Sequence, residues 1–114
     1  MNKNENLAVL WTSGDIEVAK KMVYMYTLNA KKRGWWKNID FIIWGPSAKL
    51  LSESEELQEQ IKEFIEVGIQ VKACKACADQ YRVSEKLEAL GVEVKYMGEP
   101  LTDYIKGDFK VITF

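Results

Sequence analysis

Short apolar runs alternate along the chain with longer segments in which apolar residues recur every three or four positions. Residues 7–11 (LAVLW) and 39–44 (IDFIIW) are continuous apolar runs of strand length. Residues 69–73 (IQVKA), 92–97 (VEVKYM) and 110–114 (KVITF) are three further candidate strands. Strands that alternate with helical segments in this way predict an α/β fold with a mostly parallel sheet.

The segment 16–33, between the first two strands, has the pattern of an amphipathic helix. Its apolar residues at helical spacing are Ile16, Ala19, Met22, Val23, Tyr26 and Ala30. Basic residues at 31–33 complement the negative end of the helix dipole, and Gly34 suits the left-handed position after a helix. Met25 and Leu28 widen the apolar stripe, which predicts that this helix also contacts another subunit.

The second crossover contains two helical signals. Pro46 is placed to begin a short helical turn directly after the second strand. Residues 52–56 then supply capping side chains and an acidic first turn, and Gly68 is a terminator. The apolar face between them consists of Leu57, Ile61, Phe64 and Ile65. We expect a helix of roughly fourteen residues here.

Shorter helices are predicted in the remaining crossovers. Residues 76–81 and 84–90 lie between the third and fourth strands, and 101–106 lie between the fourth and fifth. Right-handed crossovers place helices on both faces of the sheet. The last crossover has only about twelve residues, close to the minimum for a parallel return, so the direction of the final strand stays open.

Composition narrows the classes of function. A chain of 114 residues is expected to form one domain over 1–114, since this length encloses a single core. The 16 Lys+Arg against 17 Asp+Glu provide no basic excess for nucleic acid, so we expect none as a partner. The absence of histidine excludes Ser-His-Asp and Cys-His catalysis and histidine-based zinc sites. Chemistry must come from Cys, carboxylates, Lys, Tyr or backbone amides.

The cellular compartment follows from what the chain lacks. No apolar run approaches the roughly 18 residues of a membrane span, so no membrane partner is expected. Six mostly polar residues precede the first apolar run, without the long apolar region and cleavage site of a signal peptide. Two cysteines are too few for the disulfide framework of a small secreted domain. We expect a cytoplasmic protein with free thiols.

Cys74 and Cys77 are the main candidates for chemistry. Ligand sites in such sheets form at the carboxyl ends of the strands, and Cys74 follows the third strand there. The unpaired N–H groups of a first helical turn, together with Lys75, would favour a Cys74 thiolate. Cys77 lies one helical turn on, close enough to attack a sulfur atom on Cys74 or to form a disulfide. The alternative is that buried cysteines act as small hydrophobes.

Three other positions at the same edge are weaker candidates for binding. The loop at 12–15 (TSGD), including Ser13, could present backbone amides to a phosphate, but it lacks the known phosphate-binding motifs, and a turn with a helix cap is the favoured interpretation. Trp11 and Trp44 end two strands and could cover the cysteine pocket, with core packing as the alternative.

A zinc site built on Cys74 and Cys77 would need carboxylates or a second subunit's cysteines to complete four ligands.

The segment 68–98 (GIQVKACKACADQYRVSEKLEALGVEVKYMG) resembles the DsrE/DsrF-like sulfur-relay family, whose fold is called YchN-like. The resemblance extends to LAVLWTSGD, IIWGPSAKLL and PLTDYIKGDFKVITF, and so covers nearly all of the chain. It implies a three-layer α/β/α sandwich with a mostly parallel five-stranded sheet, YchN-like or flavodoxin-like. It also implies assembly into a homotrimer or hexamer.

The resemblance further implies a role for the first cysteine. In that family a cysteine ending the third strand accepts a persulfide and passes its outer sulfur to a partner, and Cys74 matches that position. The implied partners are sulfur donor and acceptor proteins, and this thiol–disulfide chemistry requires no cofactor. Cys77 departs from the best-known members, which commonly have a small residue there, and is a candidate resolving thiol.

Other functions remain open at this point. One alternative is a thiol–disulfide redox or metal-binding module that uses both cysteines of the CxxC equally. Another is a non-catalytic oligomeric protein that binds a small ligand. Whether the chain has sulfurtransferase activity, and whether a nucleotide or flavin binds at the strand ends, is not decided by the sequence.

Overall fold

The computed structural model of the chain describes residues 5–114. Its strands form one sheet in the order β4-β3-β2-β1-β5, and every neighbouring pair is parallel. The strands are β1 (Asn6–Trp11), β2 (Asn38–Ile43), β3 (Gln70–Cys74), β4 (Glu93–Lys95) and β5 (Lys110–Thr113). The predicted α/β class and five-stranded sheet are confirmed. The final strand, whose direction was open, pairs parallel to β1.

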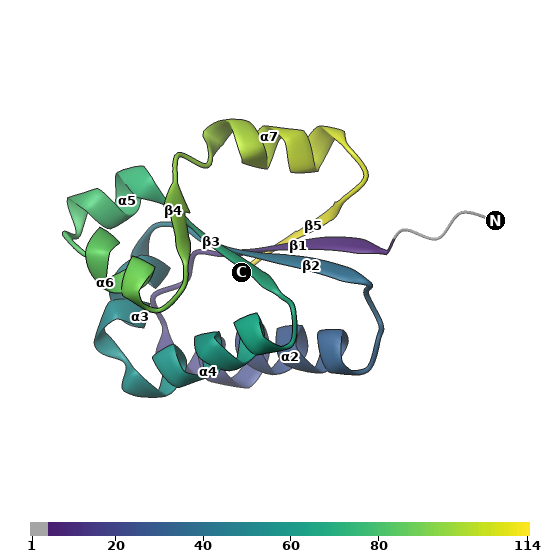
Figure 1. Cartoon of the computed structure of the whole chain (residues 1–114), viewed down its shortest axis with the longest axis horizontal. Helices are drawn as coiled ribbons and strands as arrows, with labels where there is room; N and C mark the ends of the chain where they lie inside the picture. Colours follow the sequence, from purple (N-terminus) through teal and green to yellow (C-terminus); the bar gives the residue numbers. More distant parts are fainter. Residues whose placement is uncertain (1–4) are drawn as a thin grey trace.

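Helices cover both faces of the sheet, as the crossover rule predicts. Figure 1 shows α2 and α4 on one side of the strands and α7 on the other. The helices are α1 (Ile16–Val18), the π-helical turn η1 (Ala19–Val23), α2 (Tyr24–Lys32), α3 (Pro46–Glu53), α4 (Glu55–Glu66), α5 (Lys75–Gln80), α6 (Ser84–Ala89) and α7 (Gly98–Lys106). Because β4 has only three residues, the fourth strand is shorter than the predicted 92–97.

The first helical segment departs from the predicted stripe. Ala19 and Val23 are buried as expected, but Ile16 and Met22 are 37% and 43% exposed. The π-turn η1 accounts for the difference, because its wider i→i+5 hydrogen bonding rotates the residues on either side of it relative to one another. This rotation also buries Tyr24, a residue that the helical pattern does not place on the apolar face.

The second crossover follows its sequence signals closely. Pro46 begins α3, and Ser54 caps α4 by accepting a hydrogen bond from the Leu57 amide. Three of the four predicted apolar positions, Leu57, Ile61 and Phe64, are fully buried. The two predicted helical segments are both present, and the extended backbone of Ser54 separates α3 from the 12-residue α4.

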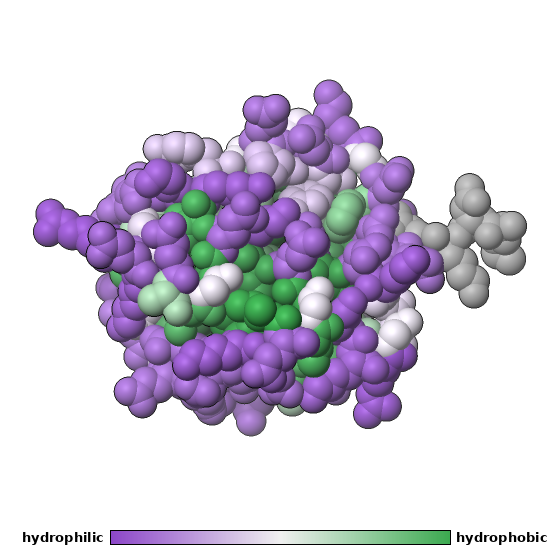
Figure 2. Space-filling model, viewed as in Figure 1, coloured by the Kyte–Doolittle hydropathy of each residue, from purple (hydrophilic) through white to green (hydrophobic). Residues whose placement is uncertain are grey.

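The two faces of the sheet carry separate apolar clusters. Strand residues point alternately to the two sides, so Val9 and Trp11 belong to the larger cluster on the side of α2 and α4. The smaller cluster, on the side of α7, contains Ala8, Ile42, Cys74, Met97 and Tyr104, with Leu10, Trp44, Cys77, Phe109 and Val111 packed against it. In Figure 2 hydrophobic residues also gather between α4 and α7, ringed by hydrophilic ones.

Within residues 5–114, no helix has both the length and the apolar character needed to cross a membrane. The prediction that the N-terminal segment is not a signal peptide depends in part on residues 1–4, which lie outside the described residues.

Candidate functional site

The two cysteines lie at the turn from β3 into α5. Cys74 is the last residue of β3 and also the N-cap of α5, with an extended backbone (φ −68°, ψ 116°). Cys77 lies in the first turn of the same helix. The strand and the helix therefore place the two side chains together at the carboxyl edge of the sheet, and both cysteines are free thiols.

The two thiols differ in exposure. Cys74 is only 5% exposed and belongs to the smaller apolar cluster, whereas Cys77 is half-buried. Met97 and Trp44 are members of the same cluster. A reagent from solution therefore meets Cys77 first, and access to Cys74 requires a side chain of this cluster to move.

Hydrogen bonding distinguishes the two sulfurs further. Burial raises the pKa of the Cys77 thiol, and a hydrogen bond with the Cys74 side chain raises it further. A hydrogen bond with the Gly45 backbone opposes this and lowers the Cys77 pKa. The raised pKa favours the protonated thiol of Cys77, whose side chain interacts with that of Cys74.

Lys75 directs its charge along α5 rather than toward the cysteines. Its Nζ forms an ion pair with Asp79 Oδ2 at 3.0 Å, and the carboxylate raises the pKa of Lys75. The same Nζ lies 5.9 Å from the centre of the Tyr96 ring. The expectation that Lys75 favours a thiolate gains no support from this geometry, because the ammonium already has a carboxylate partner one helical turn away.

The two strand-end tryptophans lie on opposite faces of the sheet. Trp44 packs against the apolar cluster that contains Cys74, as Cys77 does. Trp11 is fully buried in the other cluster, where its ring meets Tyr24 edge-on with centroids 5.0 Å apart. The suggestion that Trp11 covers the cysteine pocket is therefore wrong, and its core-packing alternative holds.

The loop at 12–15 is a turn and helix cap. The Thr12 and Ser13 amides both donate to the Phe114 carbonyl, at 2.7 and 3.3 Å. The Ser13 hydroxyl accepts from the Asp15 amide, and Asp15 caps α1 through the amides of Glu17 and Val18. Three of the four loop amides are therefore occupied within the chain, and the Asp15 carboxylate lies in the same loop, so the loop lacks the set of free amides that binds a phosphate. Ser13 is not drawn to the cysteines by any hydrogen bond in the described structure.

Metal binding by one chain finds no support in the described part of the chain. Among residues 5–114, no three Cys, Asp or Glu side chains converge on a common point. The metal-binding alternative would therefore require ligands from outside this set, because tetrahedral zinc takes four.

A buried charged cluster on the same sheet face was not predicted. Tyr104 on α7 donates its hydroxyl to Asp40 Oδ2 on β2. Lys72 Nζ on β3 donates to the Tyr104 hydroxyl at 2.9 Å and lies 3.4 Å from Asp40 Oδ2. Burial, followed by the hydrogen bond to Asp40, raises the pKa of Tyr104. The available signal was Asp40 itself, since a carboxylate inside an apolar strand requires a partner.

Comparison with known proteins places the chain in a family. The model of the DsrE/DsrF-like family matches residues 8–114. The solved structure of a conserved protein of unknown function from Bacteroides thetaiotaomicron is 40% identical, with a TM-score of 0.94 over 97% of this chain and 96% of that chain. The ychN protein from E. coli shares the fold at 15% identity, with a TM-score of 0.68 over 98% of this chain and 100% of that chain. No curated protein matches the chain.

Proposed function

We propose that this chain, which belongs to the DsrE/DsrF-like family, carries sulfane sulfur as a persulfide on Cys74. The Cys74 thiolate attacks the outer sulfur of a donor persulfide, R–S–SH. A new S–S bond forms to Cys74, the donor S–S bond breaks, and the donor leaves as a thiolate that takes up a proton. The same exchange in reverse, with an acceptor thiolate attacking the outer sulfur, unloads Cys74.

The observation that carries this proposal is the pairing of the two sulfurs at the end of β3. Burial and the interaction with the Cys74 side chain raise the pKa of Cys77, which favours its protonated thiol beside Cys74. Because a raised pKa makes a cysteine a poorer nucleophile near neutral pH, we assign the attack to Cys74 and not to Cys77.

Burial of Cys74 suits a carrier. The residue is 5% exposed among apolar side chains, so a persulfide on it is shielded from water and from small oxidants. Susceptibility of sulfur to oxidation follows thiolate character and exposure. Delivery then depends on a partner that displaces the covering side chains, which favours transfer within a protein complex over loss to solution.

Cys77 is proposed as the resolving thiol. Its thiolate attacks the inner sulfur of Cys74–S–SH, hydrosulfide leaves, and a Cys74–Cys77 disulfide forms. Two external thiols then reduce this disulfide. Because the raised pKa keeps Cys77 protonated, resolution is slow near neutral pH and the persulfide persists.

Mass spectrometry of protein treated with inorganic polysulfide tests the proposal. We expect one added sulfur on Cys74 in the wild type, none on Cys74→Ser, and a longer-lived adduct on Cys77→Ser. An intramolecular disulfide in the wild type, together with no added sulfur on Cys77→Ser, would instead support the dithiol redox function, because without Cys77 a persulfide on Cys74 cannot be resolved to a disulfide within the chain. Equal loading of Cys74→Ser would remove Cys74 from the mechanism.

Assembly of several copies is proposed as well. Met22, Met25 and Trp35 are 43%, 53% and 57% exposed and line a surface hollow of about 270 Å³ beside α2. An apolar surface of this kind favours association with another protein, and family members form homo-oligomers. Sedimentation of the wild type against Met25→Lys checks this, with dissociation to a smaller species as the expected result.

A further inference from the structure

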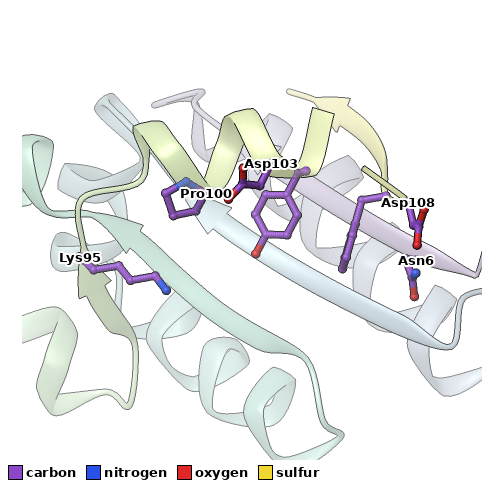
Figure 3. A pocket seen from close by; sticks show the side chains of 7 residues that line it. Asn6, Lys95, Pro100, Asp103 and Asp108 are labelled. Atoms are coloured by element: carbon purple, nitrogen blue, oxygen red, sulfur yellow. The ribbon is translucent and has the colours of Figure 1, made fainter. Parts of the chain in front are cut away.

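A pocket of about 460 Å³ lies between α7 and the sheet, on the face that carries Cys74. Its volume is in the range of small-molecule sites. The residues that line it include Lys95, Pro100, Asp103, Tyr104, Asp108 and Phe109. Figure 3 shows Lys95 reaching toward it from β4, with Pro100 and Asp103 on α7 and Asp108 beyond the end of that helix.

The pocket exists because one helix is too narrow for the sheet face. Five strands spaced about 4.8 Å apart span roughly 19 Å, and a helix with its side chains is about 10 Å wide. Figure 1 shows α7 as the helix drawn above the strands, running back into β5. The side of this face toward β3 and β4 is therefore left partly uncovered.

A cation lies at the end of the pocket nearest the cysteines. Lys95 is the Cα partner of Cys74 in the β3–β4 pairing, so the two side chains leave adjacent strands on the same face. Lys95 Nζ forms an ion pair with Glu93 Oε2 at 3.6 Å, a separation longer than a normal hydrogen bond. The two side chains are 40% and 57% exposed, and such exposed pairs are weak. A carboxylate from solution can therefore compete with Glu93 for the ammonium.

Two carboxylates lie elsewhere along the lining. Asp103 is on α7 and Asp108 follows the end of that helix. Within residues 5–114, neither carboxylate lies within 4.0 Å of a Lys or Arg nitrogen. Both are therefore able to receive an ammonium group from a ligand.

The wall between the two charged regions is apolar and held in place. Tyr104 and Phe109 meet edge to face with ring centroids 4.8 Å apart, and Pro100 completes this side. The hydrogen bonds from Tyr104 to Asp40 and from Lys72 to Tyr104 anchor the ring to the sheet. Such a wall suits methylene groups and a sulfur atom.

We propose that this pocket binds the persulfide of a small zwitterionic thiol, of amino-acid or short-peptide type, which delivers its outer sulfur to Cys74. The ligand carboxylate binds Lys95 and its ammonium group binds Asp103 or Asp108. This inference rests on the proposed function, because it names the class of donor. Holding the carboxylate beside the β3–β4 pair brings the ligand's persulfide toward Cys74, which attacks the outer sulfur while the ligand leaves as its thiol.

Binding is tested without sulfur transfer by titrating S-methylglutathione, a zwitterionic thioether, into wild-type protein and Cys74→Ser. Chemical shifts of the backbone amides report both the affinity and the place of binding. We expect saturable binding to both proteins, with the largest shifts at Lys95 and Tyr104. Lys95→Gln and the double variant Asp103→Asn/Asp108→Asn should each weaken binding about tenfold, as expected for a charge-assisted contact. Lys86→Gln and Glu85→Gln, exposed positions on α6 outside the pocket, should bind like wild type.

The outcomes separate this inference from the proposed function. Absence of binding, or equal affinity for a neutral thioether of similar size, overturns the zwitterion pocket. If inorganic polysulfide still loads Cys74 in that case, the carrier function stands without the pocket. If S-methylglutathione binds as expected and polysulfide does not load Cys74, the pocket stands and the carrier function fails.

Discussion

Lys72 Nζ on β3 lies 2.9 Å from the hydroxyl of Tyr104 on α7. The hydroxyl accepts this hydrogen bond and donates its own proton to Asp40, so one group is shared by a cation and an anion. The side chains of Asp40 and Lys72 are 9% and 14% exposed, and burial strengthens such interactions. This cluster joins β2, β3 and α7 and anchors the helix to the sheet beside the pocket.

Removal of the Tyr104 hydroxyl should destabilise the protein. Tyr104→Phe leaves Lys72 and Asp40 each without one buried partner, which should lower the free energy of unfolding by about 1–3 kcal/mol at pH 7. Urea unfolding followed by circular dichroism measures the change. Tyr96→Phe, at an exposed tyrosine, is the matched control and should unfold like wild type. Equal free energies of unfolding for the two variants would show that the Tyr104 hydroxyl contributes nothing to stability.

The raised pKa of Tyr104 gives a pH dependence of defined sign. Its folded-state pKa lies above the ordinary value of 10.0, so above pH 10 the unfolded state releases this proton before the folded state does. The stability that the protonated Tyr104 hydroxyl contributes is complete below pH 10. It is lost as the pH rises from 10 toward the folded-state pKa of Tyr104. Wild type should lose stability more steeply than Tyr104→Phe in this window, as measured by urea unfolding from pH 9 upward. Equal slopes would contradict a raised pKa.

Cys77 should ionise more readily when Cys74 is absent. The hydrogen bond with Cys74 and the charge on it both raise the Cys77 pKa, and Cys74→Ala removes them. The rate of Cys77 alkylation by iodoacetamide, followed by peptide mass spectrometry, should therefore reach half its plateau at a lower pH than in wild type. Burial, the largest cause of the shift, remains in both proteins. An unchanged midpoint would mean that the two thiols do not interact.

Asp15 should stabilise the first helix as a cap. Its Oδ1 accepts from the amides of Glu17 and Val18 at 2.8 and 3.2 Å. Asp15→Ala should cost about 1 kcal/mol in thermal or urea unfolding, and Asp15→Asn, which keeps an acceptor, should cost much less. Added inorganic phosphate should not raise the melting temperature of wild type. Stabilisation by phosphate would instead identify this loop as an anion site.

Two glycines at the ends of α7 form a matched pair for testing the helix. A Cβ on Gly107 would lie 2.8 Å from the Asp103 carbonyl oxygen, so Gly107→Ala forces a backbone shift and should destabilise by about 1–3 kcal/mol. A Cβ on Gly98 meets nothing within 4 Å, and its φ is not in the left-handed region. Gly98→Ala should therefore be neutral or stabilising by up to about 1 kcal/mol, as thermal unfolding measures. Equal changes in stability for the two variants would show that position 107 does not lie against the Asp103 carbonyl oxygen in the folded protein.

Much of the architecture could be predicted because its signals are local. The apolar run at residues 7–11, Pro46 at the start of a helix and Ser54 before α4 each act within a few residues of their own position. The CxxC could likewise be assigned to a strand-to-helix turn, since the strand before it and the helix after it are both visible in the spacing. Even so, the π-turn at Ala19–Val23 was missed, and with it the burial of Tyr24.

The sequence by itself determined the order of strands and helices, their caps, and the place of Cys74 and Cys77 at a strand end. Only the tertiary structure decided that Cys74 is buried, that Trp11 and Trp44 face opposite sides of the sheet, and that Asp40, Lys72 and Tyr104 meet. The physical reason is distance along the chain. Helix and strand signals depend on neighbouring residues, whereas burial and charge pairing depend on which strands become neighbours after folding, and in a parallel sheet every such pair is joined by a long crossover.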